Sequence, residues 1–338
     1  MSQYYYNPFG GGGMNTEQEK YFLRKQQEQN EKKELRIIGL FMGAAVIAYL
    51  IFQSVAVTLL DTAGLRTLYQ EDPVFYTAFN IIGVSFFSVA LPFGLMALVN
   101  KKRYAYPVIP SAPVKTSKCV MWVSVGMLCC TVSQFVVSYL IAFLQLLFDV
   151  KFTQGTPVEP NSVFACVLTV IGTAIIPGIC EEFAMRCCCV QLLRKYGKSF
   201  GVVAVSIVFG ILHGNVIQFI FAFIVGLVLG YITVKTDSIV PAVLIHTFSN
   251  GVSVLSSVIT YAAGEKAATA AVTAAYAFWA VAGIISGIYM LSKGEFKTET
   301  QKYNGVLTIG QKFSAFLFPG MIVPFVILIF MTAATIEF

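Results

Sequence analysis

The sequence predicts an all-α fold: a polytopic membrane helical bundle with about eight to nine transmembrane helices. Two observations carry this prediction. Of the 338 residues, 57% are hydrophobic and 12% are charged, whereas a soluble domain carries about 25% charged residues. The apolar residues also form long uncharged blocks, and a block of roughly 18 residues or more can cross a bilayer as a helix. Since lipid offers the backbone no hydrogen-bond partners, helices are the expected form of these blocks.

Nine apolar blocks are candidate spans. They are 37–60, 75–99, 119–147, 162–193, 199–214, 215–234, 238–260, 271–292 and 313–335. The fifth block is short for a span, and the fourth is long and contains charged residues. The chain then divides into a polar cytoplasmic N-terminal segment (1–36), N-terminal transmembrane helices (37–161), a core with the buried ionisable residues (162–261) and C-terminal transmembrane helices (262–338).

The basic residues indicate how the helices are oriented. The first 36 residues are polar and do not read as a secretory signal, which would place an apolar segment near the start. If this N-terminus is cytoplasmic, nineteen of the 23 Lys and Arg residues fall in cytoplasmic segments, and Arg66, Lys151 and Lys266 fall outside. Such a bias follows the positive-inside rule. It accounts for the net charge of +6, so we expect the lipid bilayer, and no nucleic acid, as a partner.

The eight cysteines lie in or at the edge of predicted spans, a pattern typical of small apolar packing residues. Cys187, Cys188 and Cys189 are consecutive, so on a helix they point about 100° apart and do not share a metal ion. Acylation of this triplet is an alternative hypothesis. Gly226 and Gly230 form a G-x-x-x-G pair, which predicts close helix packing.

Charged residues within a span are costly, at roughly 2.5–3.5 kcal/mol each on insertion scales, so they are candidates for function. The fourth block contains Glu181, Glu182 and Arg186. On a helix, Glu182 and Arg186 share a face, whereas Glu181 points about 100° away from Glu182. We therefore expect Arg186 to neutralise Glu182 and to leave Glu181 unpaired. The small residues Ala174 and Gly178, on nearly the same face as Glu181, would leave room for water or substrate.

Both histidines of the chain, His213 and His246, also fall within predicted spans. At ~1.5 Å per residue from the cytoplasmic ends of their helices, Glu181, His213 and Asn250 lie ~20 Å deep and His246 lies ~14 Å deep. These depths predict one site that gathers the four side chains. His246 and Asn250 share a helix face and can donate two hydrogen bonds to one oxygen, as a developing oxyanion requires. Phe209, one turn before His213, is placed to orient its imidazole.

Three motifs in this region resemble those of a known family. "EEFAMR", from Glu181 to Arg186, fits Glu-Glu-x-x-x-Arg; "FGILH", which ends at His213, fits Phe-x-x-x-His; and "HTFSN", from His246, fits His-x-x-x-Asn. In this order, each on its own apolar block, they resemble the CPBP family of CAAX proteases and bacteriocin-processing proteins, also called the ABI domain. The resemblance covers about residues 162–261, and no motif position departs from the family pattern.

The resemblance implies an intramembrane glutamic endopeptidase that acts on membrane-associated substrates, either CAAX-like proteins or peptide precursors, without a cofactor. The first glutamate of the family, here Glu181, is the general base, and His213 helps to hold and activate the water. His246 and Asn250 would form the oxyanion hole, in a cavity that opens to the cytoplasmic side. The supporting residues would be Glu182, Arg186 and Phe209.

The residues leave other interpretations open. Glu181, His213 and His246 also form the ligand set for a zinc-dependent version of the protease. A non-catalytic membrane scaffold or immunity protein would keep the polar cluster without turnover. A transporter can relay protons through buried Glu and His, but the chain shows no repeat and no paired broken helices. The sequence indicates neither the identity of the substrate, nor whether it is prenylated, nor the oligomeric state.

Overall fold

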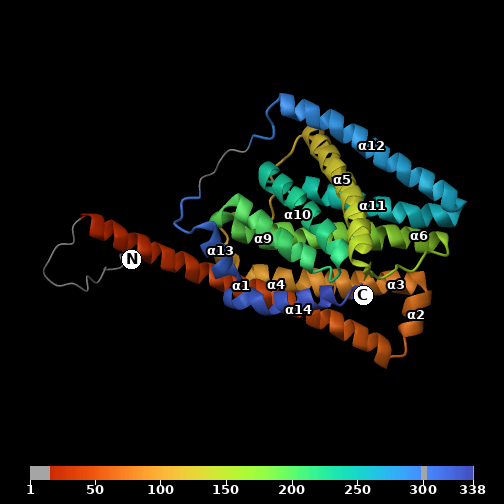
Figure 1. Cartoon of the computed structure of the whole chain (residues 1–338), viewed down its shortest axis with the longest axis horizontal. Helices are drawn as coiled ribbons and strands as arrows, with labels where there is room; N and C mark the ends of the chain where they lie inside the picture. Colours follow the sequence, from red (N-terminus) through yellow and green to blue (C-terminus); the bar gives the residue numbers. More distant parts are fainter. Residues whose placement is uncertain (1–15, 298–302, 338) are drawn as a thin grey trace.

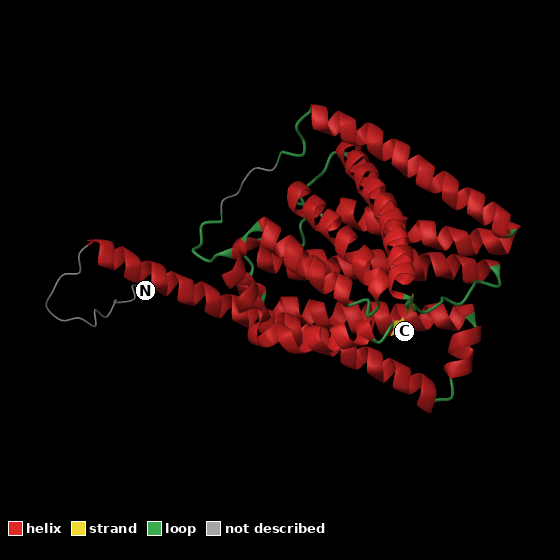
Figure 2. Cartoon of the chain, in the orientation of Figure 1, coloured by secondary structure: helices red, strands yellow, loops and turns green. Residues whose placement is uncertain are grey.

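The computed structural model describes residues 16–297 and 303–337 and shows a bundle of helices with almost no sheet (Figures 1 and 2). The strands β1 (Lys151–Phe152) and β2 (Ile336–Glu337) have two residues each and pair antiparallel. The all-α bundle predicted from the apolar blocks is therefore confirmed.

Within the described residues, eight helical stretches are long and apolar enough to cross a membrane, which indicates an integral multi-pass membrane protein. This number agrees with the eight to nine helices that the sequence predicts. The stretches are α1 (Thr16–Thr62), Pro73–Val99, α5 (Thr116–Phe148), Val163–Tyr196, α10 (Val216–Thr236), α11 (Val240–Ala263), α12 (Glu265–Ser292) and Ile309–Ala333.

Three of these stretches consist of shorter helical elements. The first is α3 (Pro73–Phe79), η1 (Asn80–Ala90) and α4 (Leu91–Val99). The second is α6 (Val163–Thr169), η3 (Val170–Ile175), α7 (Ile176–Glu182), η4 (Phe183–Val190), α8 (Gln191–Leu193) and η5 (Arg194–Tyr196). The third is α13 (Ile309–Phe316), η6 (Leu317–Met321) and α14 (Ile322–Ala333). The π-helical stretches η3 and η4 flank α7, which carries the adjacent glutamates, and such stretches are frequent at functional sites.

The fifth predicted span, 199–214, is only a short helix in the structure. α9 (Lys198–Ile211) has 14 residues, which gives a length of about 21 Å. The chain then turns, and α10 returns toward the end of the bundle from which α9 starts (Figure 1). His213 therefore lies in the turn between α9 and α10, and the prediction that it lies within a span was wrong.

The residues around His213 explain this turn. Gly214 has φ 66°, a left-handed conformation that glycine adopts without strain. Asn215 caps α10, because its side-chain oxygen accepts a backbone N–H of the first helical turn at 2.9 Å. The carbonyl of Leu212 accepts a hydrogen bond from the hydroxyl of Tyr49 at 2.8 Å. The Leu212 carbonyl, which the turn leaves without a helical partner, thus has a hydrogen-bond partner inside the protein. A carbonyl within a membrane needs such a partner, because lipid offers none.

Small residues allow α9 and α10 to pack closely. A Cβ atom added at Gly226 would lie 3.1 Å from Cβ of Ser206, and one added at Gly230 would lie 2.9 Å from Cγ1 of Val202. The glycine pair that predicts close packing therefore faces α9. Larger residues at these two positions would separate the hairpin whose turn carries His213.

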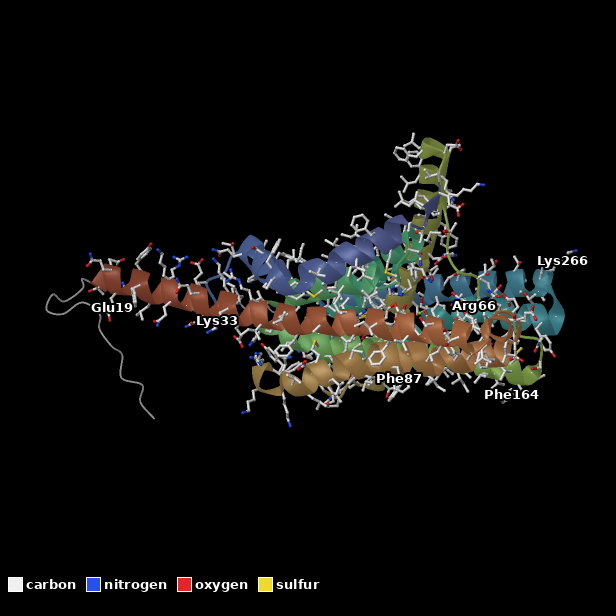
Figure 3. All side chains as sticks on the ribbon, turned by 90° about the horizontal axis from the view of Figure 1, so that it is seen from below. Glu19, Lys33, Arg66, Phe87, Phe164 and Lys266 are labelled. Atoms are coloured by element: carbon white, nitrogen blue, oxygen red, sulfur yellow. The ribbon has the colours of Figure 1, made fainter. Side chains whose placement is uncertain are left out.

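Basic segments gather at one end of the bundle, which we call the basic end. Here Lys195 of η5 lies 2.6 Å from Glu34 of α1 and also donates to the Arg103 carbonyl at 3.0 Å. Figure 3 shows Lys33 on the side of this end, and Arg66 and Lys266 near the opposite end. The positive-inside rule predicts that the basic end lies in the cytoplasm, and this orientation stays a prediction.

Candidate active site

Close packing between α7 and α11 sets the positions of the two glutamates. Gly178 of α7 faces Thr247 of α11, and a Cβ atom added at Gly178 would lie only 2.4 Å from Thr247 Oγ1. The space that the sequence suggests for water beside Gly178 is therefore filled by Thr247. Since Thr247 directly follows His246, the same packing brings Glu181 and Glu182 close to the imidazole.

Glu182 is fully buried and connects an arginine with a histidine. Its Oε2 lies 3.0 Å from Nε of Arg186, and neither side chain is exposed to solvent. Its Oε1 accepts a hydrogen bond from Nδ1 of His246 at 2.9 Å. The pair with Arg186 agrees with the expected helix spacing. The bond to His246 was not expected, because it joins two helices through residues 64 positions apart.

The bond to Glu182 determines where His246 carries its proton. A carboxylate can only accept hydrogen bonds, so Nδ1 of His246 is protonated. Nε2 is then unprotonated in the neutral ring, and it donates only when the ring is an imidazolium. This Nε2 lies 3.7 Å from Oε2 of Glu181, whose side chain is 25% exposed. Glu181 is therefore partly accessible, but it is not as isolated as the sequence suggests.

The ring of Phe209 is close to both imidazoles. Its ring centroid is 5.1 Å from that of His213 and 5.9 Å from that of His246, and both pairs are edge-to-face. The guanidinium of Arg186 lies over the same ring, 5.1 Å from its centroid. Nδ1 of His213 donates a hydrogen bond to the carbonyl oxygen of Phe209 at 2.9 Å. Nε2 of the neutral His213 therefore carries a lone pair.

Two cavities adjoin at His213. The first has a volume of about 340 Å³ and is lined by Glu181, Tyr49 and apolar side chains of α1, η1 and α14. The second has a volume of about 320 Å³ and is lined by His246, Asn250 and several Ser and Gln side chains. The residues that line both cavities are Phe209, His213 and Gln218. Because a water molecule occupies about 30 Å³ in the liquid, each cavity can hold water and part of a substrate.

Asn250 lies one helical turn after His246 at the second cavity. One N–H of its amide donates to the Thr173 carbonyl at 3.2 Å, and the amide has a second N–H for a bound oxygen. The structure thus arranges Glu181, His213, His246 and Asn250 around the two cavities. The chemical roles that the resemblance assigns to them stay predictions.

Two further residues at the cavities were not expected. Tyr49 gives no sequence signal, because it is one aromatic residue in an apolar block outside 162–261. It borders the first cavity and fixes the carbonyl next to His213. Gln218 has a weak signal, as a polar residue in the first turn of α10. Its Oε1 accepts a hydrogen bond from Asn215 at 2.7 Å, and its amide nitrogen is a donor that a bound peptide can use.

The zinc alternative requires three ligands within reach of one ion. Across residues 16–297 and 303–337, no three His, Cys, Asp or Glu side chains lie close enough together to hold a metal ion. In their neutral forms, His213 and His246 have the Nε2 lone pairs that zinc binds. To share one ion, these two side chains and Glu181 would have to move closer together.

Comparison with known proteins concerns this same region. Residues 163–252 match the protein family described as type II CAAX prenyl endopeptidase Rce1-like. No curated protein and no solved structure matches the chain. The matched segment runs from α6 into α11 and includes all three sequence motifs. The resemblance of this region to the CPBP family of CAAX proteases, which the three motifs indicate, is therefore confirmed over residues 163–252.

Proposed function

We propose that the protein is an intramembrane endopeptidase that hydrolyses a peptide bond of a membrane-associated substrate. One observation carries the proposal. Two adjoining cavities are surrounded by a partly exposed carboxylate, one amide and two imidazoles. Within the described residues, the Nε2 atoms of these imidazoles make no hydrogen bond to the protein. The match to a peptidase family supports it.

In the proposed reaction, Glu181 and His213 activate a water molecule where the cavities adjoin. Nε2 of His213 accepts one hydrogen bond of the water, and Glu181 removes its other proton as general base. The oxygen attacks the scissile carbonyl carbon, and the electrons of the C=O double bond move to the carbonyl oxygen. When this intermediate collapses, the C–N bond breaks and Glu181 returns the proton to the leaving amine. No covalent acyl-enzyme forms.

In the same reaction, His246 and Asn250 stabilise the negative oxygen of the intermediate. Removing one such donor from an enzyme typically costs about 2.7–4 kcal/mol of transition-state stabilisation. Because Nδ1 of His246 donates to Glu182, Nε2 can donate only when His246 is an imidazolium. The carboxylate of Glu182 supplies the negative charge that stabilises this cation, and Arg186 balances Glu182 in turn.

The substitution Glu181→Gln tests the proposal. The amide has nearly the shape of the carboxylate but cannot remove a proton, so we expect cleavage to fall to background while the protein still inserts and folds. Purified wild type and variant are assayed on peptides that end in a prenylated cysteine and three further residues, and on unprenylated counterparts. Membrane proteomics of cells with either protein extends the search to new C-termini that disappear in the variant.

The matched control is Glu159→Gln, which neutralises an exposed carboxylate in the segment before α6. It should cleave at the wild-type rate. Wild-type proteolysis by Glu181→Gln would remove Glu181 from the mechanism. If neither protein produces new C-termini and cells tolerate Glu181→Gln, the scaffold or immunity function is favoured. Cleavage that survives thorough chelation excludes the zinc-dependent version.

A further inference from the structure

A third cavity lies at the basic end of the bundle. It has a volume of about 530 Å³ and lies between α9, α10 and the turn after α12. It shares no lining residue with the two cavities of the candidate active site. Since none of its residues takes part in the proposed reaction, this cavity needs an explanation of its own.

Three lysines from separate elements border the third cavity. Lys198 begins α9, Lys235 lies in the last turn of α10, and Lys297 follows α12. Nζ of Lys235 donates to the Lys297 carbonyl at 2.5 Å, which joins α10 to the turn. The acid in the lining, Glu295, lies 2.7 Å from Lys118 of α5, so a lysine outside the lining balances its charge. The cavity is therefore positively charged.

The part of the third cavity that lies farther from the helix ends is apolar. Val202 follows Lys198 by one helical turn, and Leu227 precedes Lys235 by about two turns; both line the cavity. The ring of Tyr231 also lines it, and its hydroxyl is held by the carbonyl of a residue in the turn after α12 at 3.2 Å. The cations at the rim can bind an anionic headgroup, and the aliphatic side chains deeper in the bundle can bind an acyl chain, so the cavity fits an amphiphile. A soluble anion would contact only the lysines at the rim.

We propose that this cavity binds an anionic phospholipid, with its phosphate between Lys198, Lys235 and Lys297 and an acyl chain along the apolar wall. Basic pockets between transmembrane helices on the cytoplasmic side bind acidic headgroups in this way. Long lysine stems can pack on apolar surface while their ammonium groups reach headgroup level. The bound lipid connects α9, α10 and the turn after α12, at the base of the hairpin that carries His213.

Lipid retention by the purified full-length chain tests this proposal without an activity assay. The protein is reconstituted in nanodiscs with equal parts of phosphatidylcholine and phosphatidylglycerol, released, and its bound lipids are counted by native mass spectrometry. Wild type should retain phosphatidylglycerol in preference to phosphatidylcholine. The double variant Lys198→Gln/Lys297→Gln should lose affinity for it by at least about tenfold. Lys235 is left in place because it bonds to the backbone.

Two matched variants separate this site from general surface charge. Lys101→Gln/Lys102→Gln removes the same charge from exposed residues near the basic end, and it should retain lipid as wild type does. Lys198→Arg/Lys297→Arg keeps the charge and should also retain it. Three results would overturn the proposal. The first is an equal loss of phosphatidylglycerol in the Lys101 and Lys102 variant, and the second is a loss in the arginine variant. The third is equal retention of phosphatidylglycerol and phosphatidylcholine by wild type. Displacement of the lipid by inorganic phosphate would show that the ligand is a soluble anion.

Discussion

Glu181 and Glu182 are adjacent, but they have different environments. Glu182 has no exposed surface, and its two oxygens face Arg186 and His246. Glu181 is 25% exposed and borders a cavity. Only the accessible carboxylate can exchange a proton with bound water. The buried carboxylate instead holds the imidazole in one orientation, which makes Glu182 a positioning residue in the proposed reaction.

The substitution Glu182→Gln separates the charge of this residue from its shape. The amide oxygen can still accept a hydrogen bond from His246, but Arg186 loses its buried counter-ion, which typically costs about 3–5 kcal/mol of stability. We therefore expect a lower midpoint of thermal unfolding. Cleavage below that midpoint should also fall, because the His246 imidazolium loses the carboxylate whose negative charge stabilises it. Cleavage at the wild-type rate by the folded variant would contradict an imidazolium donor held by Glu182.

At the scale of elements, contacts within one helix could be predicted from the sequence and contacts between helices could not. The spacing of Glu182 and Arg186 is enough to predict their pair, because residues four apart share a helix face. The bond from Glu182 to His246 depends on how α7 packs against α11, which hydropathy does not report. The turn at His213 was hidden by apolar residues on both sides, although the following Gly214 and Asn215 are turn-forming residues.

The packing of α7 on α11 gives a prediction for Gly178→Ala. The added Cβ would lie 2.4 Å from Thr247 Oγ1 and 3.3 Å from its Cα, so the two helices must move apart near His246. We expect kcat to fall about tenfold or more, because displacements of ~1 Å can reduce rates about a hundredfold. The control is Gly251→Ala on α11, where the added Cβ meets no atom within 4 Å. If both variants have the same kcat, the packing of α7 on α11 does not determine the geometry of the candidate site.

At the scale of the whole molecule, the segment that matches the Rce1-like family packs against helices outside the match. α1 and α14 line the first cavity with residues 163–252, and Tyr49 of α1 fixes the turn at His213. The core of the bundle likewise includes buried residues of α1, α4 and α13. The three motifs predict the matched segment. They carry no information on the flanking helices, since each of these helices contributes ordinary apolar residues. The candidate site is therefore a property of the full bundle.

The orientation of this bundle can be tested with single cysteines at its two ends. Lys101 and Lys266 are exposed, and the positive-inside rule places them in the cytoplasm and outside, respectively. A membrane-impermeant maleimide should label Lys266→Cys on intact cells and Lys101→Cys only after permeabilisation. The parent chain is the control, because its eight cysteines are buried or half-buried and should react little. The reverse pattern would place the basic end outside the cell, and the phospholipid cavity would then face the outer leaflet.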